Sequence, residues 1–187
     1  MRAITLRAKR AMPDDPFLTL IVESLNLMHP RFAAANGREY APAEAGEPPA
    51  TRKARERSFL MEFYHEYRRL WDQAFPVELG LGHIIVQGEP EITSRIPDLL
   101  FWQLGERGQP DRRLGAMSVA FLSNPDAVTA DQSLLARFRK TPGYQYAVSI
   151  VVGRWAAVPA NGLPSADGVT VIFFDIERWM AKVVGAE

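Results

Sequence analysis

Cysteine is absent from this sequence of 187 residues. Disulfide bonds, thiolate metal ligands and a cysteine nucleophile are therefore excluded. An excess of charge is absent as well, because 22 Lys and Arg side chains balance 22 Asp and Glu side chains. A neutral chain has no overall attraction to nucleic acid or to an anionic membrane, although a local basic patch can still form.

Long hydrophobic runs are also missing. No stretch approaches the roughly 18 consecutive apolar residues of a membrane-spanning helix, so we expect none. The opening segment, MRAITLRAKRAMPDDPF, is basic but lacks the apolar core of a signal peptide. We therefore expect a cytoplasmic protein. The 47% apolar and 24% charged fractions are typical of a globular chain that buries one core.

The apolar pattern divides the chain into an arm over residues 1–50 and a main domain over residues 51–187. A helix is predicted over residues 14–29, where Asp14 and Asp15 can act as N-caps. The apolar residues at helical spacing are Phe17, Leu20, Ile21, Leu25 and Met28. We expect this helix to pack across the sheet or against a second copy, and the Ala-, Pro- and Gly-rich segment after it to form a loop over 34–51.

The main domain begins with a helix predicted over residues 51–75 and capped by Thr51. Its apolar face consists of Leu60, Phe63, Tyr67, Leu70 and Trp71. Strands are predicted over 77–88, 97–105, 113–122, 144–155 and 169–176. One helix is predicted over about 130–140, and a short one over 177–184.

This order of elements predicts an α/β fold with a mixed β-sheet. A meander of three strands is followed by a crossover helix and further strands, and helices flank the sheet. The strand over 113–122 is apolar almost without alternation, as expected for a strand buried on both faces.

The segment RIPDLLFW, residues 95–102, lies on the second strand of this meander. Together with the element order, it resembles the restriction-endonuclease-like fold of the PD-(D/E)XK nucleases over roughly residues 52–154. In that family the second strand carries Pro-Asp and the third ends in an acid-X-lysine motif. The resemblance implies a site where carboxylates hold Mg²⁺, the metal activates water, and a lysine stabilises the developing charge.

Transferred residue by residue, the resemblance gives Asp98 as the Asp of Pro-Asp and as the metal ligand of an active enzyme. Glu62 or Glu66 matches the acid of the first helix. The acid and lysine positions fall on Ser118 and Ala120. Serine is a poor Mg²⁺ ligand and alanine supplies no charge, so the central motif is missing.

No acid or lysine occurs from Leu114 through Asn124, and the nearest acids are Asp111 and Asp126. A rearranged site would need groups from elsewhere, for which Lys140, Gln103 and Glu66 are the candidates.

Each of these residues also has a simpler interpretation. Asp98 after a proline is typical of a turn. Glu62 and Glu66 lie near Arg69, as on a solvated, ion-paired helix face. The basic segment 137–140 can contact phosphate, but it is more typical of a solvated helix surface.

We therefore expect a catalytically inactive PD-(D/E)XK-like protein that acts as a binding or scaffolding module, with no cofactor. Its partner would be a protein or nucleic acid, and a homodimer would form through the N-terminal helix. One alternative is an Mg²⁺-dependent nuclease with a rearranged site. Another is an α/β protein-interaction domain unrelated to nucleases.

Overall fold

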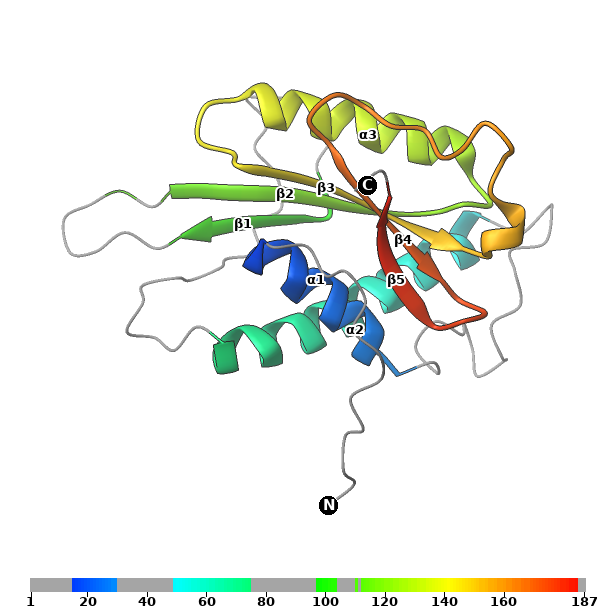
Figure 1. Cartoon of the computed structure of the whole chain (residues 1–187), viewed down its shortest axis with the longest axis horizontal. Helices are drawn as coiled ribbons and strands as arrows, with labels where there is room; N and C mark the ends of the chain where they lie inside the picture. Colours follow the sequence, from blue (N-terminus) through cyan, green and yellow to red (C-terminus); the bar gives the residue numbers. More distant parts are fainter. Residues whose placement is uncertain (1–14, 30–48, 75–96, 104–109, 111, 185–187) are drawn as a thin grey trace, which may run out of the picture.

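A computed structural model describes residues 15–29, 49–74, 97–103, 110 and 112–184 (Figure 1). Its elements are α1 (Pro16–Leu27), α2 (Pro49–Ala74), β1 (Leu99–Gln103), β2 (Arg112–Phe121), α3 (Pro125–Lys140), β3 (Tyr146–Gly153), the short 3₁₀ helix η4 (Trp155–Ala157), β4 (Thr170–Asp175) and β5 (Met180–Val184). The predicted strand over 77–88 and most of the predicted loop over 34–51 lie outside the described residues.

Five strands in the described part of the chain form one mixed sheet in the order β1-β2-β3-β4-β5. The central strands β2, β3 and β4 are parallel, whereas β1 and β5 run antiparallel to their neighbours. Helix α3 lies on one face of the sheet, and α1 and α2 lie on the other (Figure 1). The predicted mixed α/β sheet with a crossover helix is confirmed, and no helix among these residues is long and apolar enough to cross a membrane.

Helix α1 begins where the sequence predicts. The carboxylate of Asp15 caps it by accepting hydrogen bonds from the backbone N of Phe17 at 2.9 Å and of Leu18 at 3.1 Å. The buried side of α1 shares one apolar core with α2 and the sheet. The prediction that this helix packs across the sheet is confirmed, and the homodimer stays a prediction.

Two helix starts differ from the predictions. Helix α2 begins at Pro49, so Thr51 lies inside the helix and its predicted role as a cap is wrong. Helix α3 begins at Pro125 rather than near residue 130, because Asn124 caps it by accepting a hydrogen bond from Ala127 N at 3.4 Å. A proline in the first turn has a suitable φ and no N–H to leave unbonded.

The helix predicted over 177–184 is wrong, because residues 180–184 form strand β5. Asp175 Oδ1 accepts hydrogen bonds from the backbone N of Glu177 at 3.0 Å and of Arg178 at 3.4 Å, which turns the chain. Trp179 then adopts a φ of 51°. The turn brings β5 antiparallel to β4, so the backbone of β4 gains a partner that a helix would not supply.

The two faces of the sheet are packed differently. The face toward α1 and α2 belongs to one continuous core, whose aromatic members include Phe17, Phe59, Phe63, Tyr67 and Trp71. The face toward α3 has two smaller apolar clusters, one around Phe138 and one around Phe173. Ser118 and Ser149, which pair across β2 and β3, are buried between the two clusters.

Candidate functional site

Asp98 lies directly before β1, where the pairing of β1 with β2 ends. The last paired residues are Leu99 and Met117. One step farther, Asp98 Oδ2 accepts a hydrogen bond of 2.6 Å from the backbone N of Val119. The carboxylate thus binds a backbone N–H at the end of the ladder, which is a structural role for this residue.

The environment of Asp98 acts on its pKa in two directions. The residue is exposed, yet desolvation of its carboxyl by the surrounding protein atoms raises the pKa above the ordinary value. The hydrogen bond from Val119 lowers the pKa and offsets only part of this effect. A raised pKa means that the ionised form, the one that binds a cation, is less favoured here than in a free aspartate.

The strand register brings the predicted motif positions beside Asp98. Continuing the antiparallel pairing by one residue beyond Leu99 and Met117 brings Asp98 level with Ser118. Ser118 and Ala120 are both 2% exposed, on the side of β2 covered by α3. These two positions therefore contribute buried packing, and no charge, to the end of the ladder.

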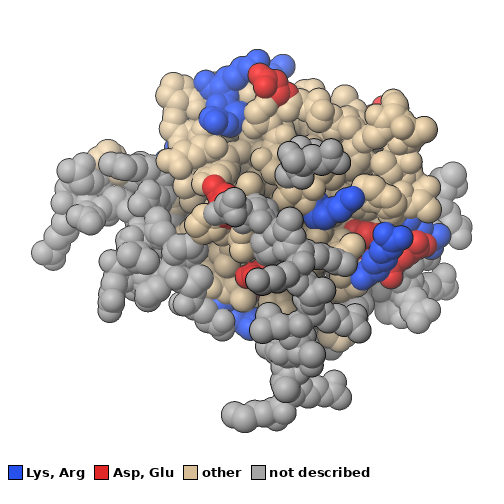
Figure 2. All heavy atoms as spheres, viewed as in Figure 1, with Lys and Arg blue, Asp and Glu red and all other residues tan. Residues whose placement is uncertain are grey.

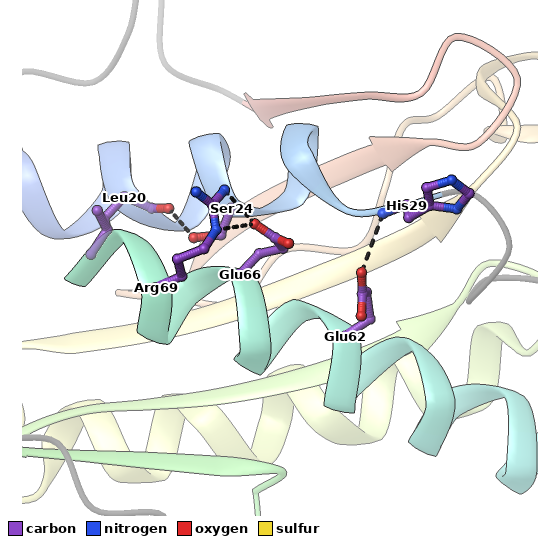
Figure 3. Close-up of polar contacts among 6 residues, drawn as sticks. All are labelled: Leu20, Ser24, His29, Glu62, Glu66 and Arg69. Atoms are coloured by element: carbon purple, nitrogen blue, oxygen red, sulfur yellow. Dashed lines mark hydrogen bonds and ion pairs between the residues drawn. The ribbon is translucent and has the colours of Figure 1, made fainter. Parts of the chain in front are cut away.

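The two acids of α2, Glu62 and Glu66, contact α2 itself and the segment that follows α1. Glu62 Oε1 accepts a hydrogen bond of 3.4 Å from the backbone N of His29, and Glu66 Oε2 lies 2.6 Å from Arg69 Nη2 (Figure 3). Both glutamates extend from α2 toward α1 (Figure 3). Among the described residues, no hydrogen bond or ion pair joins either glutamate to Asp98.

The other candidates lie toward the opposite end of β2. The segment after Lys140 returns to the sheet where Gln145 N bonds to Leu114 O, near the start of β2. Gln103 ends β1 opposite Arg112, also at the start of β2. Asp126, by contrast, lies in the first turn of α3, which follows the same end of β2 as Asp98, and Asp111 falls outside the described residues. Within the described ranges, no group of three or more His, Asp or Glu side chains could hold a metal ion.

A second region, around Trp155, was not singled out by sequence reasoning. Trp155 was assigned to the end of a core strand, but it begins η4 after β3 has ended and is 37% exposed. It borders a cavity of about 100 Å³ that is also lined by Phe173, Asp175, Arg178, Met180 and Lys182. The Pro- and Gly-containing segment 158–164 that follows Trp155 is the sequence signal that could have indicated a surface position here.

Trp155 also borders a second hollow, of about 280 Å³, which is lined by apolar residues and glycine: Val158, Pro159, Ala160, Gly162, Leu163 and Val184. We call the two hollows together the Trp155 groove. The charged end is at Lys182 and Arg178, and the apolar end is at Val158, Leu163 and Val184.

The charged side chains around the Trp155 groove differ in whether they form ion pairs. Arg154 Nε lies 3.1 Å from Glu177 Oε1, and Arg178 Nε lies 3.7 Å from Asp175 Oδ2. Lys182 Nζ instead lies over the Trp155 ring, 3.8 Å from its centre. In the described part of the chain no carboxylate forms an ion pair with Lys182, so the groove has one surplus positive charge.

Compared with models of protein families, with curated proteins and with solved structures, the chain matches none of them.

Proposed function

We propose that this protein is a binding or scaffolding module of the PD-(D/E)XK-like type that does not cleave nucleic acid. The observation that carries the proposal is the bonding of Asp98. The one carboxylate at the motif position accepts the backbone N–H of Val119 at 2.6 Å, beside the buried Ser118 and Ala120. Among the described residues, Asp98 is the one carboxylate at this position and it has a raised pKa, which makes a poor Mg²⁺ site.

The order of the elements supports the fold part of this proposal. Pro97-Asp98 lies directly before one strand of an antiparallel pair and Ser118 lies on the other, and α3 then crosses to the parallel strand β3. This is the arrangement to which the resemblance in the sequence corresponds.

A nuclease assay tests the proposal. The full chain is incubated with single- and double-stranded DNA and with RNA, with Mg²⁺, with Mn²⁺ and with EDTA. We expect no metal-dependent cleavage. Metal-dependent cleavage that disappears in Asp98→Asn would overturn the proposal in favour of a nuclease with a rearranged site.

Asp98→Asn is the appropriate variant because its side-chain oxygen can still accept the hydrogen bond from Val119, while the negative charge is removed. Asp98→Ala would also remove the end of the β1–β2 ladder, so lost activity could reflect unfolding. Asp126→Asn is the matched control, since Asp126 is an exposed acid in the first turn of α3. Metal-dependent cleavage that persists in Asp98→Asn and is absent from mock preparations would come from another site of the chain and would also overturn the proposal. Cleavage that the mock preparations share would come from a contaminant.

A further inference from the structure

The Trp155 groove combines Lys182, which has no carboxylate partner among the described residues, with an aromatic wall and an apolar floor. Residues Met180, Lys182 and Val184 alternate along β5, so they share the face of that strand that bears Trp155. Figure 2 shows positive and negative side chains grouped over the turn between β4 and β5, with mostly uncharged surface over the segment that joins β3 to β4. The two hollows that share Trp155 therefore differ: charged residues line one of them, and apolar residues line the other.

The acids near the charged end do not neutralise Lys182. Asp175 is 4% exposed and is bonded to the backbone N of Glu177 and Arg178, so its carboxylate is used within the turn. Glu177 is paired with Arg154 at 3.1 Å. The exposed Lys182 ammonium thus has the Trp155 ring on one side and is open to an incoming anion on another.

The apolar end of the groove indicates whether the partner is a nucleic acid, a small molecule or a polypeptide. Val158, Leu163 and Val184 offer no donor to a phosphate, whereas a nucleic acid strand needs several cations along its path. Pro159, Ala160, Asn161 and Gly162 are exposed, so the groove is open at the surface rather than enclosed. Two neighbouring open hollows that share Trp155, one cationic and one apolar, fit a short polypeptide better than a buried small molecule.

We propose that the Trp155 groove binds a segment of a partner protein in which an acidic side chain lies next to apolar residues. The acidic side chain pairs with Lys182 beside Trp155 and Arg178, and the apolar side chains occupy the hollow between Val158 and Val184. This inference rests on the proposed function as a binding module and names the partner's chemistry.

Selection from a random peptide library tests the inference. Displayed peptides of about twelve residues, a length sufficient for an extended segment, are selected on the immobilised full chain. We expect enrichment of sequences in which Asp or Glu neighbours Leu, Ile, Val or Phe. An enriched peptide is then synthesised with a fluorescent label and its Kd is measured by anisotropy. No enrichment, or enrichment of peptides without an acid, would overturn the inference.

Variants of the full chain locate the binding. Lys182→Glu should weaken binding of the labelled peptide by about tenfold or more, because it removes a charge-assisted contact and adds a repulsive one. Trp155→Ala should weaken it as well, and added salt should reduce the affinity of the unmodified chain. Lys140→Glu is the matched control, an exposed lysine at the end of α3. A Kd that Lys182→Glu leaves unchanged would overturn the inference.

Two further measurements distinguish lost peptide contacts from a damaged fold and from a dimer interface. Because Lys182 is exposed, Lys182→Glu should keep the circular dichroism and melting temperature of the unmodified chain. If Trp155→Ala lowers the melting temperature, its weaker binding no longer separates lost peptide contacts from a damaged fold. The Kd of Lys182→Glu is then the deciding measurement. A solution mass that falls from dimer to monomer in Lys182→Glu would assign the groove to a second copy of the chain, against the inference.

The outcome is also separable from that of the nuclease assay. Metal-dependent cleavage with intact peptide binding would remove the proposed function and leave the groove as a peptide site. An inactive protein whose groove selects no peptide would leave the proposed function standing and remove this inference.

Discussion

The two faces of the sheet differ in how completely they are filled. The face toward α1 and α2 is one continuous apolar core with many aromatic rings, among them Phe17, Phe63 and Tyr67. The face toward α3 is divided into two clusters, with Ser118 and Ser149 buried between them. A continuous core supplies stability, whereas a divided face retains polar groups and surface hollows.

The contrast has a functional counterpart. The Trp155 groove lies on the divided side of the sheet, because Phe173 and Val184 belong to or pack against one of the two clusters there. Asp98 lies level with Ser118 at the end of the β1–β2 ladder, next to the same face. The continuous face stabilises the fold, and binding is proposed only for the other.

Phe63→Ala should have the largest effect, a loss of about 4 kcal/mol in the free energy of unfolding, because Phe63 is fully buried in the continuous core. Phe138→Ala is the matched variant on the other face, where Phe138 is also fully buried but in a smaller cluster. We expect a loss of about 3 kcal/mol there, since a small cluster relaxes more readily around a cavity. Urea unfolding measures both values. Equal losses, or a larger one for Phe138→Ala, would remove the distinction between the two faces.

Tyr146→Phe should cost about 1.5 kcal/mol, because Tyr146 donates a hydrogen bond of 2.7 Å to Asp15 Oδ2, which joins β3 to the start of α1. Burial, the hydrogen bond and the charge of Asp15 raise the pKa of Tyr146 to about 12. The stability that comes from the protonated phenol is present below the ordinary tyrosine pKa and is lost as the pH rises through about 12. The unmodified chain should therefore lose stability faster than Tyr146→Phe between pH 10 and 12 (the ordinary pKa of a tyrosine is 10.0). Parallel pH profiles of the two proteins would mean that the Asp15 contact does not form in solution.

Ser149→Ala should stabilise the protein by about 1 kcal/mol. Ser149 Oγ is buried and has no hydrogen-bond partner in the part of the chain that the structure describes, so its removal ends an uncompensated desolvation. Ser24→Ala is the control on the continuous face, because Ser24 Oγ donates to Leu20 O at 2.6 Å (Figure 3). Its loss should lower the stability by about 1 kcal/mol. Thermal melts compare the two. A destabilised Ser149→Ala would show that this hydroxyl is bonded after all.

Of these variants, Asp98→Asn should change the free energy of unfolding least. Its main effect should be on how that free energy depends on pH. Because the pKa of Asp98 is raised in the folded chain, the favourable contribution of its protonated form is complete below the ordinary aspartate pKa. It is lost as the pH rises through the raised value. The stability of the unmodified chain relative to Asp98→Asn should therefore fall with increasing pH across that window, as measured by urea unfolding. A rise instead would show that the carboxylate form is favoured, as a cation site requires.

The fold could be predicted from the sequence wherever local chemistry decides the structure. Asp15 and Pro16 predict the start of α1, and the β-branched run of β3 predicts a strand. β5 could not be predicted in this way, because Trp179, Met180 and Val183 recur at three- and four-residue steps, which suits a helix. The backbone edge of β4, together with the turn at Asp175, determines the outcome, and both depend on tertiary structure.

The candidate sites show the same division. The pairing of β1 with β2 brings Asp98 level with Ser118, which is the acid position that the resemblance assigns. The hydrogen bond from Val119 to Asp98 had no signal in the sequence, because it depends on where the ladder ends. The Trp155 groove was missed because a Trp at the end of an apolar run indicates core, and only the strand boundary at Gly153 leaves it at the surface.

The contacts of α1 have a consequence for the order of events during synthesis. Its start bonds to Tyr146, and at its end Met28 O accepts a hydrogen bond of 2.7 Å from Trp179 Nε1. Asn26 Oδ1 accepts from Ala181 N, at a sequence separation of 155 residues. At about 5–20 residues per second, a ribosome needs roughly 8 to 30 s to make the strands on which α1 docks. During this interval the apolar side of the first helix has no native partner from β3 or β5, and exposed apolar surface of this kind favours aggregation and chaperone binding.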